Sequence, residues 1–260
     1  MTLLFGGGNA TDTSRRTWTT NEVITISAIS VIASYTASRF YKTRLRRIPN
    51  VGHLKPEWLR KRSLYGKVTS VGDGDNFRMF HTPGGRWIAW GILRPIPKDH
   101  KKLKDQTLSI RIAGIDAPEN PHFGRPGQEY GPEALQWLRD RVLGRYVRVL
   151  PYRRDQYERL VATVYKRKWL GLRREDVGLE MLRAGLATVY EAKMYSEFGG
   201  KKERYEEAES RAKERKVGMW SESGVVRKIL GGNKKKKLET PREFKTRMKE
   251  EGEEQQAGKG

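Results

Sequence analysis

Two short segments of the sequence place acidic side chains and an arginine where predicted β-strands end. Asp73–Asp75 reads Asp-Gly-Asp and forms a turn between two strand-like segments. The second segment, RIAGIDAPE, carries Arg111 in a predicted strand, Asp116 in the loop that follows, and Glu119 shortly after it. Two carboxylates and an arginine beside one loop are costly in a protein core but useful at a bound phosphate.

The chemistry open to these residues is that of a hard cation and a phosphate. Calcium takes oxygen ligands from carboxylates and backbone carbonyls, so two aspartates held in tight turns suit such an ion. Arginine offsets charge on a phosphate through its planar guanidinium, and a carboxylate beside a metal can activate water. Each residue taken singly is better explained as a surface ion pair or a turn residue, so the prediction depends on the whole set.

The elements that must position these residues follow from the apolar pattern. Alternation predicts strands over residues 64–71, 76–81, 86–92, 108–114, 147–152 and 160–165. Helices are expected from Gly131 to about residue 143, from Asp176 to Gly185, and from Lys202 to Lys216. This order predicts an α+β fold, a five-stranded β-barrel of the oligonucleotide-binding (OB) type with three packed helices, although the segments number one more than such a barrel holds.

The net charge of the chain indicates which kinds of partner the folded domain would bind. The chain has 53 Lys and Arg against 31 Asp and Glu, a formal net charge of +22. Residues 1–50 hold seven basic and two acidic side chains and residues 234–260 hold nine and six, which leaves +14 for residues 51–233. A folded domain this basic is typical of a protein with a polyanionic partner, either nucleic acid or an acidic lipid surface.

Cysteine and histidine chemistry are disfavoured. The absence of cysteine excludes disulfides, thiolate catalysis and zinc–thiolate sites. Four histidines, His53, His81, His100 and His122, show no metal-ligand spacing.

An apolar stretch near the N-terminus, Val23–Ser38, contains no charged residue and predicts one membrane-spanning helix over residues 23–41. A signal-peptide core and a buried helix are the alternatives. Positive charge lies mainly after the stretch, which disfavours a signal peptide and places the bulk of the protein on the positive-inside side. The leader carries Arg15, Arg16 and several Ser and Thr, a composition that also suggests a mitochondrial transit segment.

Six ordered blocks carry a family resemblance: VTSVGDGDNFRM, RIAGIDAPE, YGPEA, DQYERLVATVY, GLEMLRAGLATVY and EAESRAKERKVGMWS. In that order they resemble the staphylococcal nuclease (thermonuclease-like) domain, from about Leu64 to Glu222. The apolar stretch, the lysine-rich insertion and the wording HFGRPGQEYGPEA look most like membrane-anchored fungal endonucleases described as mitochondrial. The resemblance implies hydrolysis of phosphodiester bonds in DNA or RNA with calcium as the cofactor.

Carried over position by position, the resemblance implies roles for six residues. Asp75 and Asp116 would bind calcium, and Glu119 would be the proposed general base. Arg111 and Arg159 fall on the two catalytic arginines, and Tyr157 on a tyrosine that contacts phosphate.

Two positions depart from the family pattern. Ala117 stands where threonine is common, which removes a hydroxyl but keeps the backbone carbonyl. Glu158 stands where glycine often precedes the second arginine, and its carboxylate could pair with Arg159 or point to solvent. Neither change removes a catalytic group.

The expected organisation is a leader (1–22), a transmembrane helix (23–41), a basic linker (42–62), a nuclease-like domain (63–222) with an insertion at 93–107, and a charged, disordered tail (223–260). A solvated loop is preferred for the insertion.

Two other functions compete with the enzyme. One is a non-catalytic nucleic-acid-binding or scaffold domain tethered to a membrane, but such copies lose one or more of the arginines and carboxylates. The other is a peripheral membrane adaptor, which gives no reason for Arg111, Asp116 and Glu119 together.

Overall fold

The computed structural model describes residues 18–121, 126–167, 173–190, 197–221 and 239–257. The chain divides into two units, Met1–Arg46 and Arg47–Gly260, and each is described by itself.

The first unit is a long apolar helix. Helix α1 (Thr20–Phe40) starts at a capping box in which Thr19 and Glu22 bond reciprocally, and it continues into the π-helical turn η1 (Tyr41–Leu45). Thr20–Leu45 is long and apolar enough to cross a membrane by length and composition, criteria that a signal sequence also meets. At 1.5 Å per residue its 26 residues extend about 39 Å, more than the hydrocarbon core of a bilayer.

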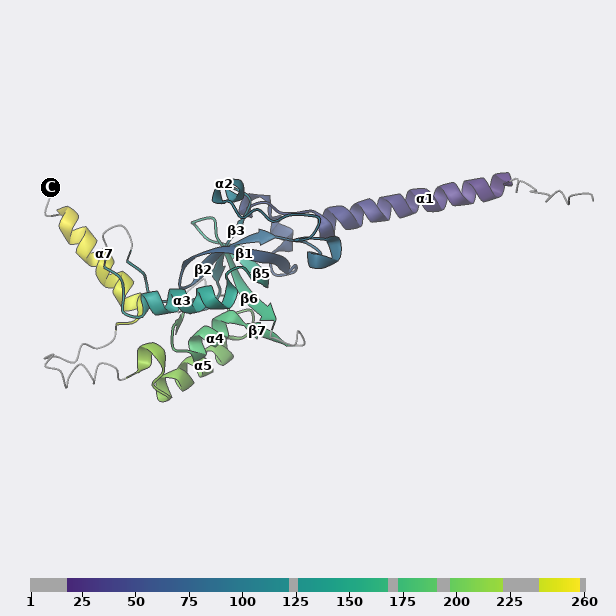
Figure 1. Cartoon of the computed structure of the whole chain (residues 1–260). Helices are drawn as coiled ribbons and strands as arrows, with labels where there is room; N and C mark the ends of the chain where they lie inside the picture. Colours follow the sequence, from purple (N-terminus) through teal and green to yellow (C-terminus); the bar gives the residue numbers. More distant parts are fainter. Residues whose placement is uncertain (1–17, 122–125, 168–172, 191–196, 222–238, 258–260) are drawn as a thin grey trace, which may run out of the picture. The chain divides into compact units, whose positions relative to one another are not determined.

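The second unit is built on a closed five-stranded barrel, which confirms the predicted fold (Figure 1). Its strands are β1 (Leu64–Asp73), β2 (Asn76–His81), β3 (Leu108–Ile112), β5 (Tyr146–Arg154) and β6 (Leu160–Arg167). Antiparallel pairs run β3-β2-β1-β5-β6, and a parallel pair between β3 and β6 closes the barrel, with Arg111 opposite Val161.

Short elements extend this barrel. Strand β7 (Arg174–Asp176) pairs with β6, while β4 (Ile115–Asp116) and β8 (Thr188–Val189) form a separate two-stranded sheet. The helices are α2 (His100–Leu103), α3 (Gly131–Val142), α4 (Val177–Arg183), α5 (Lys202–Glu214) and α7 (Pro241–Ala257), with 3₁₀ turns η2 (Val51–His53), η3 (Pro56–Trp58), η4 (Gly85–Ile88) and η5 (Gly218–Trp220). The three helices expected from the sequence correspond to α3, α4 and α5.

The core explains the packing of the three helices. Alternate residues of β1, among them Leu64 and Val68, are buried in the barrel, and α3 adds Leu138. Helix α5 contributes Tyr205, whose fully buried ring carries a hydroxyl that donates to Asp176 at the start of α4. Burial of this apolar surface, with the one polar group satisfied, fixes the helices beside the barrel.

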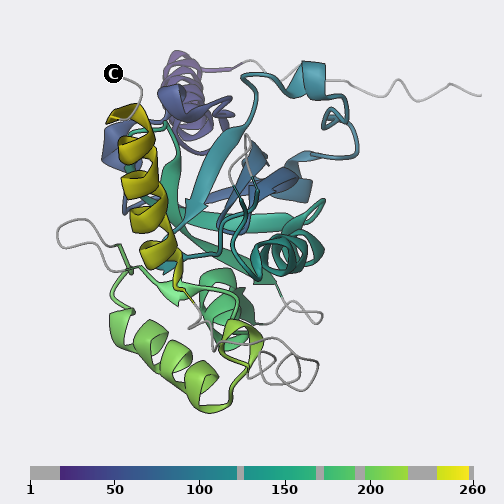
Figure 2. The same cartoon turned by 90° about the vertical axis from the view of Figure 1, so that its left-hand side faces the viewer.

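Three segments differ from the sequence expectation. Residues 86–92 were expected as a strand, but Gly85–Ile88 forms a 3₁₀ turn and Ala89 takes a φ of 62°, because Trp90 turns inward and donates to the carbonyl of Pro83. The segment 42–62 is not a free linker, since Ile48 and Val51 are buried in the core. Within the tail expected to be disordered, residues 241–257 form α7, the yellow helix of Figures 1 and 2.

Candidate active site

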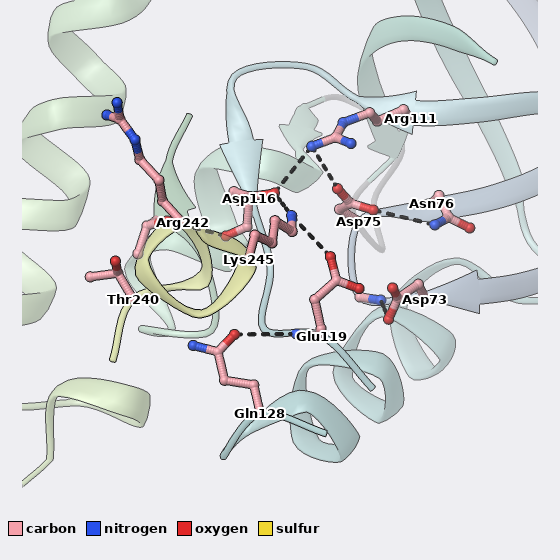
Figure 3. Close-up of polar contacts among 12 residues, drawn as sticks. Asp73, Asp75, Asn76, Arg111, Asp116, Glu119, Gln128, Thr240, Arg242 and Lys245 are labelled. Atoms are coloured by element: carbon pink, nitrogen blue, oxygen red, sulfur yellow. Dashed lines mark hydrogen bonds and ion pairs between the residues drawn. The ribbon is translucent and has the colours of Figure 1, made fainter. Parts of the chain in front are cut away.

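One arginine joins two buried aspartates at the edge of the barrel (Figure 3). The Arg111 Nη2 atom lies 3.1 Å from Asp75 Oδ2 and 3.1 Å from Asp116 Oδ1. Asp75 comes from the turn between β1 and β2, and its backbone carbonyl accepts a hydrogen bond from Ile112 on β3. Both aspartates are more than 90% buried, so their charges depend on close partners rather than on water.

The Asp-Gly-Asp turn lies close to the loop that carries Asp116. A Cβ atom added at Gly74 would lie 2.8 Å from the Cβ of Ala117, a distance too short for two carbon atoms. Glycine is therefore needed here for close approach rather than for an unusual backbone angle. Ala117 presents only a small side chain at this contact.

Asp116 and Glu119 are held by their backbones. Asp116 pairs with Thr188 between β4 and β8, and the Thr188 hydroxyl donates to the Asp116 carbonyl at 3.3 Å. The backbone amide of Gln128 donates to the Glu119 carbonyl at 2.8 Å, and the Gln128 side chain accepts from the Glu119 amide at 3.4 Å. Glu119 thus presents a carboxylate that is 35% exposed at the rim of the buried pair.

A second cation reaches the site from α7. The Lys245 ammonium lies 2.7 Å from Asp116 Oδ1 and 2.9 Å from Glu119 Oε1 (Figure 3). Arg111 and Lys245 therefore approach Asp116 together, and each binds a further carboxylate.

For Asp116, Glu119 and Lys245, burial acts on the pKa in one direction and the oppositely charged neighbours act in the other. Burial raises the pKa of Asp116 above its ordinary value, although Lys245 and Arg111 act against the rise, and burial likewise raises the pKa of Glu119. Burial disfavours the charged form of Lys245, but Asp116 and Glu119 together raise its pKa. The two cations thus do not fully offset the cost of burying these carboxylates.

The second predicted arginine lines the same hollow as the first. Arg111, Arg159, Tyr157 and Tyr190 are among the residues that line this hollow of about 380 Å³. The Arg159 Nε atom donates to Asp155 Oδ2 at 2.7 Å, and the other Asp155 oxygen accepts the backbone amides of Tyr157 and Arg159. Asp155 thereby orients Arg159, and these bonds lower the pKa of Asp155 although burial acts against them.

Glu158 does not contribute the carboxylate that binds Arg159. It is exposed and adopts a φ of 56°, the left-handed region in which glycine is favoured. The partner of Arg159 is Asp155.

The structure brings the predicted residues into two adjoining groups. Asp75, Arg111, Asp116 and Glu119 form one, and Arg111 shares the hollow with Arg159 and Tyr157. The sequence did not predict three residues that contact the site: Asp155, Gln128 and Lys245. Asp155 stands in the block DQYERL and Gln128 in the block beginning HFGRPGQ, so both could have been noticed, whereas Lys245 lies in a charged tail with no motif.

The donor set fits a hard divalent cation. Asp75 and Asp116 direct oxygen atoms at one shared point, now approached by Arg111, and Glu119 lies next to Asp116 across the Lys245 ammonium. Within the described ranges no three acidic or histidine side chains already converge as a metal cluster. A cation bound at Asp116 Oδ1 would therefore replace the two nitrogen atoms that contact this oxygen.

Comparison with known proteins agrees with the barrel. Residues 109–222 match the model of the family described as "Staphylococcal nuclease homologue". The chain is 52% identical over 221 residues to "Probable endonuclease LCL3" of Pyricularia oryzae, covering 85% of this chain and 80% of that protein. It is 52% identical over 234 residues to "Probable endonuclease lcl3" of Pyrenophora tritici-repentis (89% and 83%), and 55% identical over 210 residues to the Uncinocarpus reesii protein "Probable endonuclease LCL3" (80% and 67%).

A relative of such identity over most of both chains establishes the family. The chain belongs to the staphylococcal nuclease family, and its closed barrel with packed helices agrees with that membership.

Proposed function

We propose that this protein is a membrane-anchored, calcium-dependent endonuclease that hydrolyses phosphodiester bonds of DNA, RNA or both with little sequence specificity. The observation that carries the proposal is the joint placement of two buried aspartates, Glu119 and Arg111 at one barrel edge. Family membership and the endonuclease names of the relatives support the same activity.

Each residue has a task that its position allows. Asp75 and Asp116 would hold a calcium ion, whose charge would serve to polarise a phosphoryl oxygen and offset developing negative charge. Glu119, at the exposed rim of the pair, accepts a proton from the attacking water. Arg111 and Arg159, which line one hollow, donate hydrogen bonds to phosphoryl oxygens, and Tyr157 adds a contact to the phosphate.

Low sequence specificity follows from the kind of contact. Arginines that bind phosphate read charge and shape but not base identity. The formal charge of +22 adds a general attraction for polyanions that weakens as salt concentration rises.

The activity is tested with the full chain in detergent micelles, supercoiled plasmid and single-stranded RNA, in calcium or in EDTA. Arg111→Ala, Glu119→Ala and Arg159→Ala are compared with the wild type. Arg183→Ala is the matched control, because Arg183 also binds a carboxylate, that of Glu180, but on α4 away from these residues. Cleavage that needs calcium and is lost in the three variants but kept in the control is expected. Intact substrates with the wild type, or full cleavage by the three variants, would refute the proposal and favour a non-catalytic binding domain.

The anchor and its location are a separate part of the proposal. Thr20–Leu45 would cross the membrane once, and the arginines of the leader favour a mitochondrial membrane. Alkaline carbonate extraction of isolated mitochondria should leave the protein in the membrane pellet. Release into the soluble fraction would contradict an anchor, and absence of the protein from mitochondria would contradict the location.

A further inference from the structure

Helix α7 places a positive charge where the proposed metal site needs to be open. The Lys245 ammonium contacts Asp116 at 2.7 Å and Glu119 at 2.9 Å, so it occupies an oxygen of a proposed calcium ligand and an oxygen of the proposed base (Figure 3). A divalent cation at Asp116 and a water molecule at Glu119 would draw on these same two carboxylates. The lysine and the bound cation therefore compete.

The position of Lys245 is built into the helix. Thr240 and Glu243 form a reciprocal cap that starts α7, with the Thr240 amide donating to Glu243 Oε2 at 2.8 Å. Phe244, next to Lys245, is only 7% exposed, and the Gln128 side chain donates to the carbonyl of Glu239. Three kinds of contact, apolar, backbone and ionic, thus dock the first turns of α7 on the domain.

We propose that α7 is an autoinhibitory segment that lowers calcium affinity until the ion displaces Lys245. The proposal rests on the proposed function, because it assigns a regulation to the same site. The free energy that α7 gains by docking on the site reduces the free energy of calcium binding. The coupling is reciprocal, so bound calcium weakens the docking of α7 by the same factor.

The test measures calcium binding rather than cleavage. Isothermal titration calorimetry is done on the full chain in detergent micelles without nucleic acid, for the wild type, Lys245→Met and Phe244→Ala. Both substitutions should tighten calcium binding by about 5- to 150-fold, the usual range of coupling between two sites. Lys249→Met is the matched control, since Lys249 lies one helical turn further along α7 and is exposed, and it should bind like the wild type. Hydrogen exchange of the α7 amides in the wild type should accelerate when calcium is added.

The outcomes separate the two proposals. Equal calcium affinity in all four proteins overturns the autoinhibition, as does unchanged exchange of α7 in saturating calcium. Tighter binding by the two variants without cleavage of any substrate upholds the autoinhibition and overturns the nuclease function. No calcium binding by any protein overturns the calcium requirement and the autoinhibition together.

A second observation, independent of the site, concerns the segment between β2 and β3. Trp87, Ile92 and Leu93 are 98%, 65% and 81% exposed. The segment is nevertheless folded, because Trp90 is buried and Arg94 stacks on its ring at 4.2 Å. Three large apolar side chains fixed outward on an ordered turn are the arrangement expected of a surface that meets an apolar partner.

The charges around this turn favour a lipid surface. The residues that follow it include four lysines: Lys98, Lys101, Lys102 and Lys104. Arg47, the first residue of the second unit, donates to Gln106 Oε1 at 2.6 Å, so the chain enters that unit beside the end of the same segment. Arg47 follows Thr20–Leu45 almost directly in the sequence, and a membrane crossed by those residues is therefore within reach.

We infer that Trp87, Ile92 and Leu93 insert into the headgroup region of the membrane that holds α1, with the lysines on anionic lipid. This inference rests on the proposed anchor. Aromatic and aliphatic side chains flanked by Lys and Arg are suited to that interface, where the basic residues are attracted to anionic lipid.

The absence of cysteine makes the test direct. Leu93→Cys and, as a control, Ser210→Cys on the exposed face of α5 each give a single site for an environment-sensitive dye. The full-length proteins are reconstituted into vesicles of phosphatidylcholine with 30% phosphatidylserine. Doxyl-labelled lipids should quench the dye at position 93 and not at position 210. The inference would be overturned if both dyes were equally accessible to water, or if the dye at position 93 responded to single-stranded DNA but not to vesicles. Loss of α1 from the vesicles would instead overturn the anchor.

Discussion

Removing Arg111 should destabilise the fold as well as the proposed chemistry. The guanidinium is 19% exposed and contacts Asp75 and Asp116, whose side chains are 9% and 5% exposed. In Arg111→Met both carboxylates lose this partner. Lys245 still offsets Asp116, so the main loss falls on Asp75. Breaking a buried ion pair by removing one partner costs about 3–5 kcal/mol, and the remaining lysine places the expected loss near the lower value, about 3 kcal/mol.

Urea unfolding in EDTA, followed by circular dichroism, measures this loss in free energy of unfolding. Arg111→Met combined with Asp75→Asn should recover part of it, because the unpaired charge is then gone. Arg183→Met removes a partner of Glu180 in a half-exposed pair and should cost less than about 1 kcal/mol. The reasoning fails if Arg111→Met unfolds within 1 kcal/mol of the wild type, or if the double variant is no more stable than the single one.

Three further predictions concern local structure. Glu158→Gly should raise the free energy of unfolding by about 1 kcal/mol in the same urea assay, because φ at this exposed position is 56°; an unchanged midpoint would argue against strain. Burial lowers the pKa of His81 to about 3, so the unfolded chain takes up a proton below pH 6.5 that the folded chain does not. Stability should fall between pH 7 and pH 5 by up to about 1.4 kcal/mol per unit, and less steeply in His81→Gln; parallel pH curves would contradict this. Gly74→Ala should cost about 1–3 kcal/mol, because its Cβ meets Ala117, whereas Gly72→Ala meets only the movable end of a side chain and should cost less. Melting curves of the two alanine variants decide the last point, and a smaller loss at position 74 would refute it.

The sequence was sufficient for the barrel and for the group around Arg111, because strand alternation and short motifs are local signals. Asp75, Arg111 and Asp116 stand at strand ends that neighbouring strands bring together, so their meeting follows from the fold class. For the segment 86–92 the same reasoning predicted a strand, which is wrong. Its composition is mostly apolar, as in a strand, but a tertiary contact, the burial of Trp90, decides its conformation.

Other parts of the site could not be inferred from local pattern. Lys245 is separated from Asp116 by 129 positions and lies in a sequence rich in Lys and Glu, where any one lysine resembles the next. Its role depends on which face of α7 docks, and that is determined by Phe244 and Gln128 rather than by a motif. Glu158 appeared to be a possible partner of Arg159, since adjacency in sequence says nothing of the left-handed turn that directs it away.

The parallel pair of β3 and β6 also makes assembly of the site a late event in folding. Arg111 lies opposite Val161, two residues after Arg159, so the contact that closes the barrel is the one that brings the two arginines to a common hollow. Pairing of segments this distant along the chain costs loop-closure entropy before any contact offsets that cost. Such pairing therefore forms slowly. A chain still emerging from the ribosome carries Arg111 without its counterpart. The pair of arginines that can bind one phosphate together therefore arises only in a fully folded molecule.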